Sequence, residues 1–176
     1  MHGRGKSRRP RLSDGSEMMK RPALIPITLL LILSPLARAD RFAPPPEFYR
    51  AECGSCHVAY PAELLTAEDW RRVLATLDRH YGSDASVEGA TRARIEEYLY
   101  ARAGNRFKPG TAQTDPPRLT RTPWFERKHR EVATRDWNSP RVKTPANCGA
   151  CHRRAETGSF REGEIVMPDG RRYEED

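Results

Sequence analysis

No apolar segment of this sequence is long enough to cross a membrane as a helix. The run from Leu24 to Leu33 is about half of the roughly 20 residues that a membrane-spanning helix needs. It follows the basic pair Lys20-Arg21 and precedes the small-x-small pattern Ala37-Arg38-Ala39. This arrangement is typical of a secretory signal peptide. We therefore expect residues 1–39 to be cleaved during export, which leaves a mature chain that begins at Asp40.

The stretch before Met18 and Met19 lacks the features of a signal peptide, because it is basic and polar throughout. We expect translation to begin at one of these methionines, so that residues 1–18 are not translated.

The mature chain lacks a strong net charge. The full sequence has 31 basic and 24 acidic residues and a net charge of +7, but residues 1–39 contain 8 of the basic and 2 of the acidic residues. The remaining 137 residues carry a net charge of +1. A strongly basic balance would have indicated a nucleic-acid partner. Because that balance disappears with the leader, we expect no nucleic acid to bind.

Cysteine is scarce, and all four cysteines lie in two short motifs of the same spacing. The motifs are Cys53-Gly54-Ser55-Cys56-His57 and Cys148-Gly149-Ala150-Cys151-His152. A C-x-x-C-H sequence is typical of a c-type haem site, where both thiols form thioethers with the porphyrin and the histidine binds the iron. We therefore expect two covalently attached haem groups with iron. The predicted haem-binding residues are Cys53, Cys56, His57, Cys148, Cys151 and His152.

Other uses of four cysteines fit less well. A zinc ribbon has its two pairs roughly 15–20 residues apart, whereas 91 residues separate Cys56 from Cys148. A thioredoxin-like pair would lie beside a βαβ pattern, which this sequence does not show. Two structural disulfides stay open as an alternative in an oxidising compartment. They leave the histidine after each pair unexplained.

The mature chain is also poor in aliphatic residues and rich in Arg, Pro and Glu. A chain of 137 residues with this composition has too little apolar material for two independent cores. Two porphyrins would supply the missing apolar centres. We therefore expect the protein without haem to be poorly folded.

Three helices are predicted around the first motif. Pro44-Pro45-Pro46 leads into a helix that begins at Glu47 and ends near Val58 or Tyr60. Thr66 and Asp69 resemble a capping box, and apolar side chains at helical spacing extend that second helix to Tyr81, with Gly82 at its end. Ser86 is predicted to cap a third helix over residues 87–103.

The second half begins with a different composition. Residues 108–123 are rich in Pro, Thr, Asp and Arg and have no periodicity, which predicts a linker. Thr122 and Pro123 then predict the start of a short helical segment that contains Trp124, Phe125 and His129. We expect a loop over residues 136–144 and a helix over 145–158 that carries the second motif. The predicted domains are 40–107 and 124–176.

Two further histidines are candidates for the remaining iron ligands. His80 lies at the edge of the second predicted helix, and His129 lies close to the second motif in sequence. For His80 the alternative is a solvated side chain at a helix end. For the second haem the rival ligand is Met167, the only methionine after the leader. The predicted metal ligands are His57, His80, His129 and His152.

The mature chain contains these four histidines and no others, which matches four axial positions on two irons. With every position filled, the protein would be an electron carrier that works by outer-sphere transfer, and not an enzyme. The alternative is a small haem enzyme, such as a peroxidase or reductase, or a gas-binding protein, with one five-coordinate haem.

Four segments of the sequence resemble a known family. They are Glu52-Cys53-Gly54-Ser55-Cys56-His57-Val58-Ala59-Tyr60-Pro61, Leu77-Asp78-Arg79-His80-Tyr81-Gly82, Thr122-Pro123-Trp124-Phe125 and Asn147-Cys148-Gly149-Ala150-Cys151-His152. The mature chain resembles small periplasmic dihaem cytochromes c, of the type that partners a high-spin monohaem oxygen-binding cytochrome.

The resemblance implies a mainly α fold with two small haem-centred domains, the first like class I cytochromes c. It also implies two bis-histidine haems of low potential, a periplasmic location, and a redox partner that is either the monohaem cytochrome or a b-type membrane cytochrome. Membrane contact would occur only through that partner. The pairs Arg71-Arg72 and Arg153-Arg154 could steer an acidic partner, or could be simple solvated charges.

Overall fold

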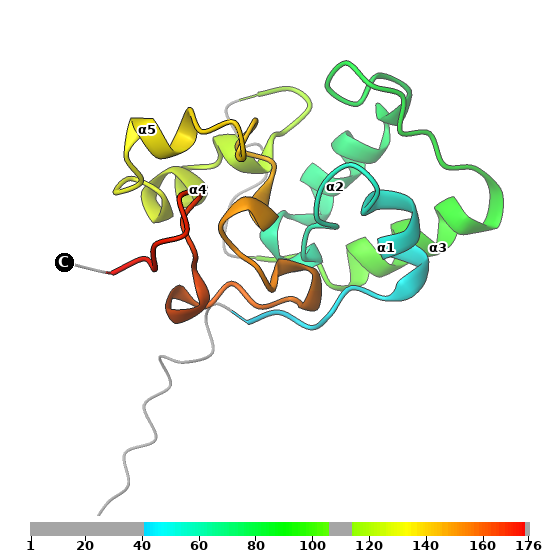
Figure 1. Cartoon of the computed structure of the whole chain (residues 1–176). Coiled ribbons are helices and arrows are strands. Elements are labelled where there is room, and N and C mark those ends of the chain that lie inside the picture. Colours follow the sequence, from blue (N-terminus) through cyan, green and yellow to red (C-terminus); the bar gives the residue numbers. More distant parts are fainter. Residues whose placement is uncertain (1–40, 106–113, 175–176) are drawn as a thin grey trace, which may run out of the picture. The chain divides into compact units, whose positions relative to one another are not determined.

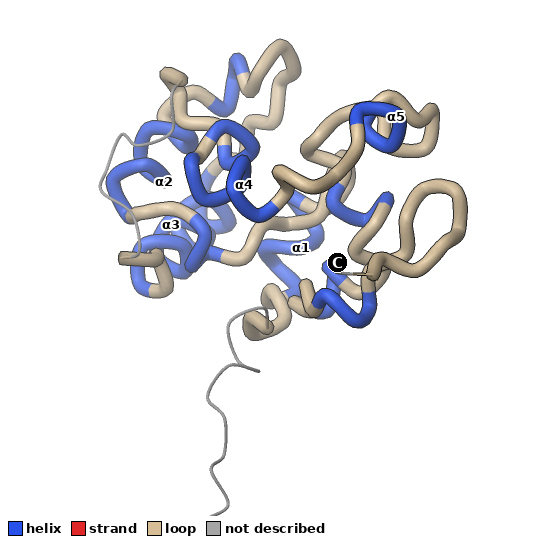
Figure 2. The backbone as a smooth tube through the Cα atoms, turned by 90° about the vertical axis from the view of Figure 1, so that its left-hand side faces the viewer, coloured by secondary structure: helices blue, strands red, loops and turns tan. Residues whose placement is uncertain are grey.

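The structure is a computed structural model that describes residues 41–105 and 114–174. Within these ranges the regular secondary structure consists of short α-helices and 3-10 helices, with isolated β-bridges but no strand. Figure 1 and Figure 2 show these helices joined by long loops. The prediction of a mainly α fold is confirmed. No helix in the described ranges is long and apolar enough to traverse a membrane.

Some predictions concern residues outside these ranges. The predicted signal peptide, residues 1–39, and residues 108–113 of the predicted linker are among them. The described residues belong to one compact unit, residues 35–176. The division into domains at 40–107 and 124–176 stays a prediction.

Three α-helices form the first half of the fold: α1 (Glu47–Cys53), α2 (Ala67–Leu74) and α3 (Gly89–Ala101). The start of α2 is as predicted, because the Thr66 hydroxyl accepts a hydrogen bond from the Asp69 backbone N–H at 3.1 Å. A cap of this kind stabilises a helix by about 1 kcal/mol. The last carbonyl groups of a helix have no hydrogen-bond donor within the helix. At the end of α2, the Arg92 side chain of α3 donates a hydrogen bond to the Leu74 carbonyl at 3.0 Å.

α2 stops at Leu74, although its apolar stripe continues to Tyr81. The Thr76 hydroxyl donates to the Val73 carbonyl at 3.2 Å. Such local bonds from a threonine side chain compete with helix continuation. The chain then forms a separate 3-10 helix, Leu77–Arg79. The predicted long second helix is therefore wrong in its second half.

The other two helices are also shorter than predicted, α1 at its end and α3, predicted over residues 87–103, at both ends. α1 ends at Cys53, more than one turn early, because Gly54 and Ser55 after it are poor helix formers. α3 begins later than predicted and Ser86 is not its cap. The Asp84 carboxylate accepts a hydrogen bond from the Ser86 N–H at 2.9 Å and holds it in a turn.

The second half contains α4 (Pro123–Lys128), α5 (Thr134–Trp137) and the 3-10 helices Leu119–Arg121, Cys148–Ala150, Ala155–Thr157 and Glu162–Glu164. The predicted start of α4 is confirmed. Its cap is the Thr122 hydroxyl, which accepts from the Phe125 N–H at 3.2 Å, and Pro123 occupies the first helical position. α5 lies partly in a stretch predicted as loop.

The helix predicted over residues 145–158 does not form. The second motif begins on the 3-10 helix Cys148–Ala150, and its last two residues, Cys151 and His152, follow that helix. The side-chain amide of Asn147 donates to the carbonyls of Arg141 and Val142, at 3.1 and 3.2 Å. These bonds tie the start of the motif to the preceding loop. The backbone of Asn147, with a ψ of 69°, lies outside the helical region. A continuous helix through the motif would break this anchor.

The main buried cluster consists of apolar side chains from the first three α-helices and from the segments between them, together with Phe42 and Leu119. The Trp70 indole N–H donates to the Ala62 carbonyl at 2.8 Å inside this cluster. Leu119 belongs to the stretch predicted as a linker. Its burial shows that the end of that stretch packs against the first half of the chain.

The first described residues pair with the segment that follows the second motif. The Phe42 N–H donates to the Gly158 carbonyl at 2.8 Å, and Arg41 forms a bridge with Ser159. The Phe42 ring packs edge-on against Phe160, with ring centroids 5.7 Å apart. Arg41 and Phe42 therefore form part of the structure around the second motif.

Replacing Gly158 with alanine should destabilise the protein by about 2 kcal/mol or more. Gly158 has a φ of +78°, which costs other residues about 1–2 kcal/mol, and a Cβ there would clash with the Phe42 carbonyl. The matched control is Gly163→Ala, because a Cβ at Gly163 has no neighbour within 4 Å. Its effect should stay within about 0.5 kcal/mol. Denaturant unfolding followed by circular dichroism measures both; equal midpoints for the two variants would contradict this packing.

Candidate haem-binding sites

The first candidate site brings His57 and His80 together. Cys53 is the last residue of α1, and Cys56 and His57 follow on the turn after it. His80 comes directly after the 3-10 helix Leu77–Arg79, and so lies on a turn and not on a helix as predicted. The centroids of the His57 and His80 rings are 6.3 Å apart, with an angle of 27° between the ring planes.

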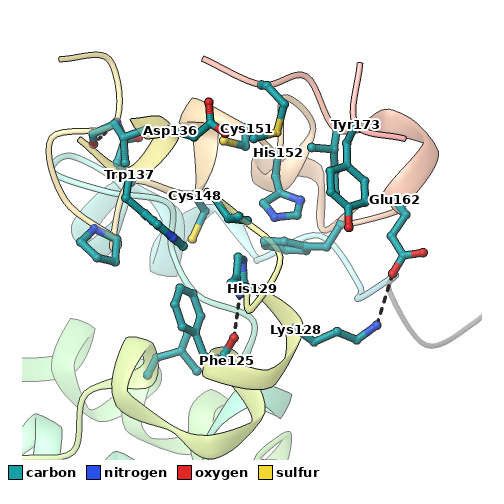
Figure 3. Close-up of a pocket in the computed structure, with 18 of the residues that line it drawn as sticks. Phe125, Lys128, His129, Asp136, Trp137, Cys148, Cys151, His152, Glu162 and Tyr173 are labelled. Carbon is teal, nitrogen blue, oxygen red and sulfur yellow. Dashed lines mark hydrogen bonds and ion pairs between the residues drawn. The ribbon is translucent and has the colours of Figure 1, made fainter. Parts of the chain in front are cut away.

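The second candidate site brings His129 and His152 together. His129 follows the last residue of α4, and His152 completes the second motif. Their ring centroids are 6.1 Å apart, with an angle of 79° between the planes. Figure 3 shows His129 reaching up from α4 toward His152, with Cys148 beside the space between them.

These separations fit one metal ion between each pair of rings. An imidazole nitrogen binds a metal at about 2.0–2.1 Å and lies about 1.1 Å from its ring centre, so two rings on opposite sides of one ion have centres about 6.3 Å apart. The observed values are 6.3 and 6.1 Å. Two histidines whose rings touched directly, with no space for a metal, would be closer.

Hydrogen bonds prepare two of these imidazoles for metal binding. The Nδ1 of His57 lies 2.8 Å from the Val58 carbonyl, and the Nδ1 of His129 lies 2.8 Å from the Phe125 carbonyl. A carbonyl only accepts, so each Nδ1 carries the proton and donates. This tautomer leaves the lone pair on Nε2, which is the atom that binds a metal.

Burial favours the uncharged form of His80 and His129. It lowers the pKa of His80, with the charges of His57 and Arg118 adding to the effect. It also lowers the pKa of His129, opposed by the hydrogen bond to Phe125. Both shifts favour the neutral imidazole that a metal requires.

A cavity surrounds the pair His129 and His152. The cavity is open to solvent on one side. The wall includes Cys148 and Cys151 and is otherwise mainly apolar. Its large apolar side chains include Phe42, Trp124, Phe125, Trp137, Phe160 and Met167.

Met167 lies in this wall and is only 3% exposed. The rival ligand therefore shares the cavity with His129. The 6.1 Å separation between the His129 and His152 rings favours histidine as the ligand. Two imidazoles at this separation would occupy both sides of one iron and leave no position for a methionine.

No disulfide joins any of the four cysteines, so the structure gives no support to the alternative of two disulfides. Burial raises the pKa of Cys53 to about 11, with a smaller contribution from Glu52. Burial also raises the pKa of Cys148 to about 11. Before a haem is attached, thiols in these positions would therefore be neutral at pH 7, as expected for cysteines packed against apolar surroundings.

An ion pair between the buried Asp136 and the exposed Arg171 lies at the second site, and no pattern in the sequence predicts it. Asp136 is 6% exposed, lines the cavity, and accepts a bond from Arg171 at 2.7 Å. Asp136 falls in the stretch predicted as loop and Arg171 in the charged tail, and no spacing rule connects them.

The chain resembles known proteins over most of its length. Residues 49–160, well over half of the chain, match the family model described as "Dihaem cytochrome c". The chain is similar to the diheme cytochrome type c from Shewanella baltica OS155, with 40% identity, a TM-score of 0.63, and coverage of 73% of this chain and 97% of that one. It is also similar to the diheme cytochrome c from Rhodobacter sphaeroides, with 41% identity, a TM-score of 0.59, and coverage of 68% and 99%. No curated protein gave a match.

Proposed function

Because this chain belongs to the dihaem cytochrome c family, we propose that it carries electrons between redox proteins by outer-sphere transfer through two bis-histidine, low-spin haems. Family membership implies two covalently attached haem c groups with iron, and each C-x-x-C-H motif supplies the attachment. The bound haem iron supplies one-electron redox chemistry, with a potential set by its axial ligands.

The observation that carries this proposal is the separation of the histidine pairs. His57 with His80, and His129 with His152, are spaced as two imidazoles on one metal should be. With both axial positions filled by side chains, no position on either iron is open to a substrate. A small enzyme or gas-binding protein would need one of these histidines to be absent or displaced.

Exposure to small haem ligands tests the proposal. The reduced protein with carbon monoxide, and the oxidised protein with cyanide, should keep the visible spectra of the untreated samples. Rapid formation of an adduct at one haem would identify an open coordination position and favour the enzyme or gas-binding alternative.

We further propose that the protein is exported to the periplasm with cleavage after Ala39. Phe42 packs close to the second site. If residues 1–39 were not cleaved, they would continue directly from this packed segment. Intact mass of periplasmic material should correspond to residues 40–176 plus two haems. A mass that retains residues 20–39, or that lacks one haem, would count against this.

The partner we propose is another redox protein, a monohaem c-type or b-type membrane cytochrome, bound only transiently. The arginine pairs considered for steering are partly neutralised. Arg72 lies 2.8 Å from Asp115, and Arg154 lies 3.4 Å from Glu164. We therefore expect the transfer rate to a partner to fall by less than about tenfold between low and physiological salt, the lower end of electrostatic steering. Stopped-flow mixing at several salt concentrations measures this; a steeper fall would show that charge dominates the encounter.

A further inference from the structure

Tyr60 lies between the two candidate haem sites. Its ring stacks on the ring of His57, with centroids 4.6 Å apart and an angle of 18° between the planes. Its hydroxyl donates to the Ala146 carbonyl, at a long 3.4 Å. Ala146 stands just before the second motif, so one side chain contacts an iron ligand of the first site and the approach to the second.

The contact with Ala146 continues directly to a haem-binding cysteine. The same Ala146 carbonyl accepts a hydrogen bond from the Cys148 N–H at 3.0 Å. A short chain of contacts therefore runs from the His57 ring through Tyr60 and Ala146 to Cys148. It consists of one ring stack and two hydrogen bonds to a shared acceptor.

The position of Tyr60 is fixed from the other side as well. The buried Tyr49 of α1 donates its hydroxyl to the Tyr60 carbonyl at 2.9 Å. Burial raises the pKa of Tyr60 above its usual range, with Cys148 and Tyr81 adding to the effect. The phenol is therefore neutral under ordinary conditions and remains a hydrogen-bond donor.

We propose that Tyr60 links the two haem sites and sets the rate of electron exchange between them. This inference rests on the proposed function, because it needs a haem at each site. In the exchange one iron is oxidised by one electron while the other is reduced by one electron. Tyr60 keeps its proton and its electrons throughout; it is a positioning residue that holds His57 and the second motif in fixed proximity.

Two substitutions separate the parts of this link. Tyr60→Phe keeps the ring stack on His57 and removes the hydroxyl bond to Ala146. Tyr60→Leu removes both contacts. Tyr100→Leu is the matched control, because Tyr100 is a partly buried tyrosine of α3 whose ring faces Arg71 and not a candidate site.

The measurement is the intramolecular exchange rate in the half-reduced holoprotein. Haem-methyl NMR resonances report it, with dilution used to remove exchange between molecules, and redox titration gives the two potentials. We expect a several-fold slower rate in Tyr60→Leu, a smaller decrease in Tyr60→Phe, and the native rate in Tyr100→Leu, after correction for any change in driving force. A native rate in Tyr60→Leu, or an equal decrease in Tyr100→Leu, would overturn the inference.

Failure of the link and failure of the proposed function give different results. An open coordination position in the native protein would refute the proposed function before any variant is made. If the native protein binds no ligand and Tyr60→Leu exchanges at the native rate, only the role of Tyr60 is refuted. If Tyr60→Leu does not take up both haems, Tyr60→Phe decides: a slower rate supports the link and a native rate overturns it.

Discussion

Replacing His129 with alanine should convert the second haem from low spin to high spin and leave the first haem low spin. The His129 ring lies 6.1 Å from that of His152 across the space that a metal would occupy. Removing it opens one axial position, while His57 and His80 remain in place. Optical and paramagnetic resonance spectra of the oxidised protein measure the change. Added imidazole should enter the vacated volume and restore the low-spin spectrum.

Met167→Leu is the control for this variant. Met167 lines the same cavity and is as buried as a core residue. Leucine has a similar volume, so packing should change by less than about 1.5 kcal/mol. We expect both haems to stay low spin. If Met167→Leu produced the high-spin haem while His129→Ala left both haems low spin, methionine would be the ligand and the all-histidine assignment would be wrong.

Replacing Cys148 and Cys151 together with serine should remove one covalent haem and much of the order in the second half of the chain. The cavity around His152 is lined mainly by apolar side chains, and the segments around it are short helices and loops. Without a haem to fill this cavity, the protein should lose unfolding free energy comparable with the whole stability of a small domain, about 5 kcal/mol or more. Intact mass and circular dichroism should show one haem fewer and less helix.

The control for that pair lies inside the same motif. A Cβ at Gly149 would have only the Asn147 side chain within 4 Å, at 3.9 Å. Gly149→Ala should therefore keep both haems and the native circular dichroism spectrum. A doubly substituted protein that kept its full helix content and thermal stability would show that haem is not a structural component of the second site.

Local features were predictable from sequence because their causes are local. The Thr122 and Pro123 start of α4 depends on neighbouring residues alone. The same is true of the Thr66 cap of α2. The two C-x-x-C-H motifs also need only their own spacing to indicate a haem. In each case the signal and the structure that it predicts lie within one helical turn.

The errors arose where a side chain bonds to a more distant or competing group. Thr76 ends α2 through its own hydroxyl, although the apolar stripe continues beyond it. Asn147 anchors the second motif to a preceding loop and prevents a continuous helix. Phe42 and Asp136 reach the second cavity from parts of the chain that no periodic pattern connects to it. These contacts depend on tertiary structure, which spacing rules do not encode.

The paramagnetic resonance spectrum of the fully oxidised native protein tests the central claim most directly. Two irons with two histidines each should give only low-spin signals. The signals of the two irons should also differ. Nearly parallel imidazole planes, such as those of His57 and His80 at 27°, separate two of the iron d orbitals in energy. Crossed imidazole planes leave the same two orbitals nearly equal in energy. The pair His129 and His152, at 79°, should give the more anisotropic signal. A high-spin signal from either iron, or a near-infrared band of sulfur-to-iron charge transfer, would contradict the assignment of two bis-histidine haems.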